Sequence, residues 1–298
     1  MDIIIDVAIF LIILLITFFY LMSSKYKSNF YVLLFSYFQG FILTFIYAGL
    51  YNKPLTEVLV AIPLFSATYY LLIKQIPYLI IGLLSQRKKE EYKDEILLTW
   101  LNTIENLRSK KLILTKYAGP RSFNAFFLGI PIPFSKKVNI VIGQKLIDAF
   151  DAKQRIVIIA HEVGHYLKKH VLKRYLVFVI LTIIIEFIFL YLSNFTIFSL
   201  DTTVEVKTLL FFVFGFIFYL LIIIIFNIIS WYIEFKADES SLVLTKDISN
   251  FEKVFEKIKN EIPMKNRGKL LNLILYDHPL TEDRLQRGER FFREKLSR

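Results

Sequence analysis

Cysteine is absent from the 298 residues of this chain. Disulfide bonds and cysteine-ligated metal sites are therefore excluded, and a reducing compartment is permitted. The features of a cleavable secretory signal are also lacking. The first apolar run, residues 3–22, is accompanied by Asp2 and Asp6 instead of a basic start, and no A-x-A-like site follows it. We therefore expect this run to be retained as a membrane span.

Acidic residues are outnumbered by basic ones, 26 against 37, which gives a formal net charge of +11. The basic residues stand at the ends of apolar runs, as in Arg87-Lys88-Lys89 and Lys168-Lys169, where they set membrane topology. We therefore expect no nucleic-acid partner. The chain is 55% hydrophobic with a mean hydropathy of +0.52, which is typical of a multi-pass membrane protein.

Five apolar runs are long enough to cross a bilayer: residues 3–22, 30–51, 58–84, 175–198 and 208–232. The third run contains Pro63, Lys74 and Pro77, so it is either one kinked span or a span followed by an interfacial segment. If the basic junctions are cytoplasmic, residues 85–170 and 234–298 face the cytoplasm. We predict five spans in the cell membrane.

The segment before the fourth span contains His161-Glu162-Val163-Gly164-His165. Residues four apart lie on the same face of a helix, so His161 and His165 can present their imidazoles to one metal ion. Glu162 sits beside them, where a hydrolytic site needs a general base. This H-E-x-x-H pattern is typical of zinc peptidases. We expect a helix that begins after Asp151, continues through Lys169 and runs directly into the fourth span.

A zinc site of the two-histidine class needs a third protein ligand, often a carboxylate. Glu234 follows the fifth span, and the hairpin of spans four and five returns it to the same membrane face as His161. Asp238 lies on the same helical face as Glu234 and is expected to accept a hydrogen bond from the outer nitrogen of His161. The alternative is that both carboxylates form a charged interfacial cap. We predict one Zn²⁺ per chain.

These motifs resemble, in order and spacing over residues 85–298, the membrane zinc metallopeptidases of the HtpX and type I CAAX prenyl protease group. In that group the E-x-x-x-D motif, here Glu234 to Asp238, supplies the third zinc ligand and its outer partner. The H-P-x-x-x-x-R motif matches His278 and Arg284, and the resemblance places both near the substrate and the transition state, as catalytic residues.

The resemblance also implies a strand that aligns an extended peptide substrate. It matches the N-A-F motif here, so the implied substrate-binding residues are Asn124, Ala125, Phe126 and Phe127. The sequence departs from the group at Leu280, where a second proline is common, and at Leu128-Gly129, where Gly-Gly is common. Three N-terminal apolar runs exceed the two of HtpX and fall short of the seven-span prenyl protease.

The expected fold is a mainly α membrane protein with a zincin-like α+β catalytic domain of the gluzincin type, split around a transmembrane hairpin. The expected divisions are an N-terminal membrane region (residues 1–84), the first part of the catalytic domain (85–174), the hairpin (175–233) and the second part of the catalytic domain (234–298). Within the first part, residues 96–107 have amphipathic helical spacing, and three segments are typical of strands: residues 111–117, 124–128 and 138–142.

The function that follows is a membrane-embedded zinc endopeptidase. Its expected partners are polypeptide substrates, membrane proteins above all, and the lipid bilayer; a homo-oligomer is compatible with the sequence. Resemblance to HtpX implies membrane-protein quality control. The alternatives are prenyl-protein processing and a non-enzymatic scaffold with a vestigial metal site. A site-2-type intramembrane protease is disfavoured because no Leu-Asp-Gly segment occurs, and a transporter because no repeats are visible.

Two further polar residues have no role in this interpretation. His170 follows Lys168-Lys169 and is expected to face solvent or lipid headgroups. Glu186 lies inside the fourth apolar run, where a carboxylate is either neutral and hydrogen-bonded or lines a polar cavity.

Overall fold

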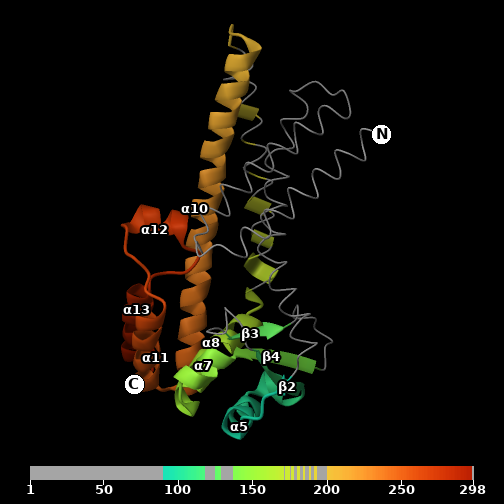
Figure 1. Cartoon of the computed structure of the whole chain (residues 1–298), viewed down its shortest axis with the longest axis vertical. Helices are drawn as coiled ribbons and strands as arrows, with labels where there is room; N and C mark the ends of the chain where they lie inside the picture. Colours follow the sequence, from blue (N-terminus) through green and yellow to red (C-terminus); the bar gives the residue numbers. More distant parts are fainter. Residues whose placement is uncertain are drawn as a thin grey trace. The chain divides into compact units, whose positions relative to one another are not determined.

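The computed structural model describes residues 90–117, 125–128, 137–170, parts of 172–192, and 200–296 (Figure 1). The first three predicted spans, Asn124 and Glu186 lie outside the described residues. The chain forms two compact units. One comprises Met1–Tyr78, Val177–Ile228 and Lys269–Asp277, and the other comprises Leu79–Leu176, Ile229–Gly268 and His278–Arg298. All the described candidate site residues belong to the second unit.

The second unit contains a four-stranded mixed sheet in the order β1-β2-β4-β3. Its strands are β1 (Glu90–Glu91), β2 (Lys111–Tyr117), β3 (Ala125–Leu128) and β4 (Lys137–Gly143). The last three agree with the predicted strands to within a residue at each end. β4 pairs in parallel with β2 and antiparallel with β3. Among the described strands, β3 pairs with β4 alone, so β3 is an edge strand of this sheet.

The predicted helix at residues 96–107 is divided into α5 (Glu95–Thr103) and α6 (Glu105–Arg108). Ile104 between them is extended, with φ −82° and ψ 111°, although the sequence has no proline or glycine there. The interruption accompanies burial of Leu101, Ile104 and Leu107 in one core. In an unbroken helix, Leu107 would point about 120° away from Leu101, off a single apolar face.

Helix α8 (Ala152–Leu167) carries the H-E-x-x-H motif and packs against β3, α5 and α11 (Ile248–Glu261) (Figure 1). It begins at the predicted N-cap through a capping box: Asp151 accepts from the Gln154 amide at 2.9 Å, and the Gln154 side chain accepts from the Asp151 amide at 3.2 Å. The α7 helix (Gln144–Ala149) precedes it.

The expectation that α8 runs unbroken into the fourth span is wrong. The helix ends at Leu167, and Lys169 has a φ of 53°, in the left-handed region that interrupts a helix. Helical structure resumes at His170. Helix α8 and the helical residues that begin at His170 are therefore separate helical segments.

Helix α10 (Val204–Thr245) is 42 residues long and carries both candidate acidic residues of the site. After it come α11, α12 (Lys269–Leu275) and α13 (Thr281–Lys295). Of the described residues, one helical stretch, Val213–Thr245, is long and apolar enough to cross a membrane by length and composition, and 18 consecutive residues within it have a mean hydropathy of 2.7. The C-terminal half of α10 is held to α8 by the buried Ser241 hydroxyl, which donates to the Val157 carbonyl at 2.7 Å.

Candidate metal centre

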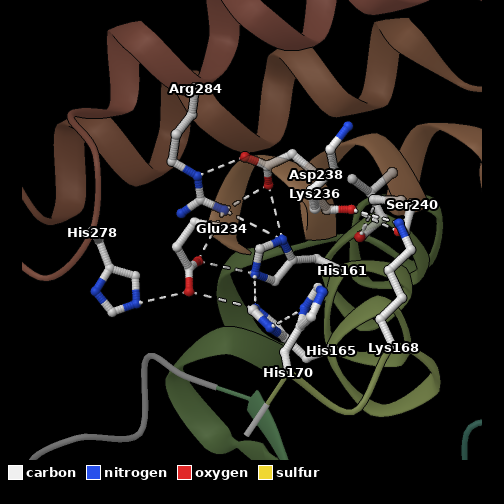
Figure 2. A network of polar contacts seen from close by, with 12 residues as sticks. His161, His165, Lys168, His170, Glu234, Lys236, Asp238, Ser240, His278 and Arg284 are labelled. Carbon is white, nitrogen blue, oxygen red and sulfur yellow. Dashed lines mark hydrogen bonds and ion pairs between the residues drawn. The ribbon is translucent and has the colours of Figure 1, made fainter. Parts of the chain in front are cut away.

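Three side chains from two helices converge on one point in the second unit (Figure 2). His161 and His165 come from successive turns of α8, and their Nε2 atoms lie 3.0 Å apart. Glu234 comes from α10 and is only 3% exposed. Its Oε2 lies 3.4 Å from His161 Nε2, and its Oε1 lies 3.5 Å from His165 Nε2. Among the described residues, these three form a group that could hold a metal ion.

The donor set fits a zinc ion. At Zn–N and Zn–O lengths of roughly 2.0–2.2 Å and a tetrahedral angle, two ligand atoms are separated by about 3.3–3.5 Å. The three separations in the structure, 3.0, 3.4 and 3.5 Å, are close to that value. Two imidazoles and one carboxylate are also the ligands that catalytic zinc sites use, with a fourth position left open.

The outer side of His161 is held by Asp238, one turn after Glu234 on α10. The Asp238 Oδ1 lies 2.9 Å from His161 Nδ1, the contact that the helical spacing predicts. Arg284 from α13 binds the same carboxylate with two nitrogens: Nε donates to Oδ2 at 2.8 Å and Nη2 donates to Oδ1 at 2.6 Å. Such a planar two-bond pair fixes the orientation of the carboxylate. The guanidinium also stacks 4.8 Å above the Phe255 ring.

Two further basic side chains approach Glu234. Arg174 Nη2 donates to Oε1 at 2.7 Å, and His278 Nε2 lies 3.6 Å from the same oxygen. Arg174 is not predictable as a site residue from the sequence, because a basic residue at the end of an apolar run normally indicates topology. His278 has 47% of its side chain exposed, against 14% for His161, so it is the member of the group that is most open to a bound molecule.

The prediction for His170 is wrong. This residue is 5% exposed, and its Nδ1 lies 3.0 Å from the Nδ1 of His165. The signal that could have indicated this is the clustering of histidines, since three of the four in the chain fall between residues 161 and 170. The contact itself depends on the break at Lys169, which has no sequence signature.

Burial and neighbouring charges shift the acid–base properties of α8 side chains in the metal-free protein. Burial disfavours a charged His161, but hydrogen bonds to Asp238 and Glu234 outweigh it and raise the pKa of His161 to about 9. Burial lowers the pKa of His165 to about 4, although Glu234 acts in the opposite direction. Burial raises the pKa of the Glu162 carboxyl to about 7, opposed first by the charge of His161.

The glycine of the motif allows the two ligand-bearing helices to approach closely. A Cβ atom on Gly164 would lie 2.8 Å from the Ser240 Cβ and 3.3 Å from the Ala237 carbonyl oxygen, both on α10. Carbon atoms normally pack at about 3.5–4.0 Å. The absence of a side chain at Gly164 therefore sets the spacing between the histidines and Glu234.

The candidate substrate-binding strand lies next to this centre. Ala125 begins β3 and is buried, and β3 packs on α8. Phe126 and Phe127 follow it in the strand, paired with Val141 and Ile140 of β4. The strand β3 therefore packs on α8, the helix that carries the two candidate histidine ligands.

This arrangement is typical of the metal centre of a zinc peptidase. It combines the edge strand β3, the H-E-x-x-H helix α8 and the helix α10, which supplies Glu234. A family model described as peptidase family M48 matches residues 87–290. Because this match covers more than half of the sequence, the chain belongs to peptidase family M48, a family of zinc metallopeptidases.

Among solved structures, the chain is similar to that of S. mikatae Ste24p, with a TM-score of 0.56 and 19% sequence identity. The similarity covers 84% of this chain and 62% of Ste24p, so this chain spans less than two thirds of that protein's length. At this identity the likeness concerns the fold. A comparison with curated proteins finds no significant match.

Proposed function

We propose that this protein is a membrane zinc endopeptidase that hydrolyses peptide bonds with the residues of the α8–α10 centre. The observation that carries the proposal is the convergence of His161, His165 and Glu234 at ligand spacing, with Glu162 on the same helix. The three would hold one Zn²⁺ per chain. A zinc ion held there would supply a water molecule of lowered pKa and a Lewis acid for the scissile carbonyl.

The other side chains have distinct roles in this proposal. Glu162, with a pKa near 7 in the metal-free protein, takes the proton of the attacking water and passes it to the leaving amine. His278 donates a hydrogen bond to the developing oxyanion, which its exposure permits. The described contacts of Arg284 go to Asp238, His161, Phe255 and Glu234, so its main role is to hold Asp238 against His161.

An extended substrate would bind along β3. As an edge strand, β3 offers backbone groups for pairing with an incoming peptide, which gives affinity from the main chain and loose selection of side chains. Ala125, Phe126 and Phe127 lie in this strand, and Asn124 immediately precedes it. Loose selection suits a protease that degrades many different proteins.

A membrane location is supported by exposed apolar side chains on helical segments. On α10, Val213, Ile217 and Leu221 are 43–48% exposed at four-residue intervals. Ile180, Ile184 and Ile188 repeat the pattern in the preceding helical residues, at 45–55%. Continuous apolar stripes of this kind are unusual in water and suit contact with lipid. We infer five spans, with residues 85–174 and 234–298 forming the two parts of the catalytic domain on the cytoplasmic side.

The inferred substrates are polypeptides, membrane proteins in particular, and the inferred role is quality control. Prenyl-protein processing is the second candidate, because one of the similar solved structures is that of Ste24p, a CAAX protease of the same family. The two differ in their need for an isoprenoid group. Parallel assays with unprenylated membrane proteins and with a prenylated peptide distinguish them, since quality control predicts cleavage of the unprenylated substrates.

The experiment that tests the proposal compares four purified proteins: wild type, Glu162→Gln, Glu234→Ala and Glu256→Gln. The last makes the same chemical change as the first variant on an exposed residue of α11. We expect one zinc per wild-type chain, full zinc content but at least about 100-fold lower cleavage for Glu162→Gln, and weakened zinc binding for Glu234→Ala. Glu256→Gln should match wild type. Retained turnover by Glu162→Gln, or a wild-type protein without zinc, would refute the proposal.

A further inference from the structure

The side chains of His170 and His165 contact each other through their Nδ1 atoms. The two Nδ1 atoms lie 3.0 Å apart, and the rings meet edge to face, with centroids 5.0 Å apart and an interplanar angle of 78° (Figure 2). His170 is 5% exposed. A buried polar ring at hydrogen-bond distance from a second one is a specific contact, because a buried nitrogen without a partner is costly.

The direction of this hydrogen bond follows from the role of His165. To bind a metal through Nε2, a neutral imidazole must carry its proton on Nδ1. His165 then donates from Nδ1, and the Nδ1 of His170 accepts. The geometry of the pair is therefore suited to the one tautomer of His165 that leaves Nε2 free, the atom that lies 3.0 Å from His161 Nε2 and 3.5 Å from Glu234.

An uninterrupted helix would not allow this contact. Residues five positions apart on an α-helix point about 140° away from each other. Lys169 breaks the helix with a φ of 53°, a conformation that costs a residue other than glycine roughly 1–2 kcal/mol. The break turns His170 back onto His165. Backbone strain of this kind is commonly retained where it serves a site.

We propose that His170 is a positioning residue, which holds the imidazole of His165 in the orientation and tautomer that bind the metal. The inference rests on the proposed function, because it assumes that His165 is a metal ligand. It extends to His165 the arrangement seen at the other imidazole, where Asp238 lies 2.9 Å from the Nδ1 of His161. His170 contacts the Nδ1 atom of His165, whereas the Nε2 atom of His165 faces the candidate metal position, so His170 is not expected to touch the substrate.

The test separates hydrogen bonding from packing at position 170. His170→Asn keeps a polar atom near the place of Nδ1, because both groups branch from Cγ. His170→Phe fills the space with a ring that has no nitrogen, and His170→Ala removes both. Each variant is purified in detergent, its folding is checked by the melting temperature of the chelator-treated protein, and its zinc dissociation constant is measured by competition with a chromogenic chelator. Lys169→Gly is the control, because glycine adopts the same backbone conformation without strain.

We expect the zinc dissociation constant to rise about 10- to 100-fold in the Phe and Ala variants, the usual effect of removing a partner of a ligating histidine. The Asn variant should stay within a few-fold of wild type, and so should Lys169→Gly. The inference would be overturned if His170→Phe bound zinc as tightly as the wild type, or if His170→Asn bound zinc as weakly as His170→Ala. If wild-type protein binds no zinc, the proposed function fails as well, so the two failures are distinguishable.

Discussion

The glycine between the two histidines of the motif gives the sharpest quantitative prediction. In Gly164→Ala the new Cβ would lie 2.8 Å from the Cβ of Ser240, roughly 1 Å inside the normal packing distance. Overpacking of this size costs about 1–3 kcal/mol, whereas alanine favours a helix over glycine by about 1 kcal/mol. The net loss of stability is therefore small, about 0–2 kcal/mol, since the two effects oppose each other.

The effect on the site should be larger than the effect on stability. Relief of the clash requires α8 and α10 to separate by up to about 1 Å, and the ligands lie on both helices. A displacement of 1 Å in a catalytic group can lower the rate about 100-fold. We therefore expect Gly164→Ala to remain folded, with a melting temperature lower by no more than about 8 °C, and to lose zinc affinity and most of its peptidase activity.

A second substitution tests the cause. Ser240→Gly removes the atom that the new methyl group meets, so the double variant Gly164→Ala/Ser240→Gly should recover zinc affinity. Ser240→Ala keeps that atom and should not restore binding. The interaction between the two positions is obtained from a double-mutant cycle. Wild-type zinc affinity in Gly164→Ala, or equal recovery with Ser240→Gly and Ser240→Ala, would refute the reasoning.

Three further predictions concern the same unit. Asp151→Ala removes the capping box of α8 and should cost about 1 kcal/mol, measured as a fall in melting temperature with little change in zinc content. Arg284→Ala leaves Asp238 buried without its two-bond partner, so stability should fall by about 3–5 kcal/mol and zinc affinity should fall with it; a stable variant with wild-type affinity would contradict this. The pKa of His161 is about 9 in the metal-free protein, and the metal must displace that proton. Zinc affinity should therefore rise with pH and level off above about 9; a flat profile between pH 7 and 9 would contradict it.

The features that the sequence predicts well are those determined by neighbouring residues. Asp151 indicates the start of α8, and β2 has the predicted bounds. The pairing of the candidate site residues could be predicted because helical periodicity relates His161 to His165, and Glu234 to Asp238. Each pair depends on one turn of regular helix.

The features that were missed depend on distant contacts or on unusual backbone conformations. The parallel pairing of β2 with β4, which lets β2 bypass β3, the next strand in the sequence, cannot be deduced from the composition of the strands. The break at Ile104 occurs without proline or glycine and accompanies burial of three apolar side chains. The contact of His170 with His165 requires a left-handed lysine at position 169, which intrinsic preference would place in the ordinary helical region.

The division of the centre between α8 and α10 has a consequence for biosynthesis. A ribosome that makes the chain at roughly 5–20 residues per second completes both histidines on the order of seconds before Glu234, with the apolar hairpin sequence in between. Arg284, which holds Asp238 in place, follows later still. With the proposed five spans, the nascent chain would therefore have no complete metal centre while its own apolar segments are being inserted. A protease assembled in this order cannot cleave neighbouring chains at its site of synthesis until nearly all of its sequence has been translated.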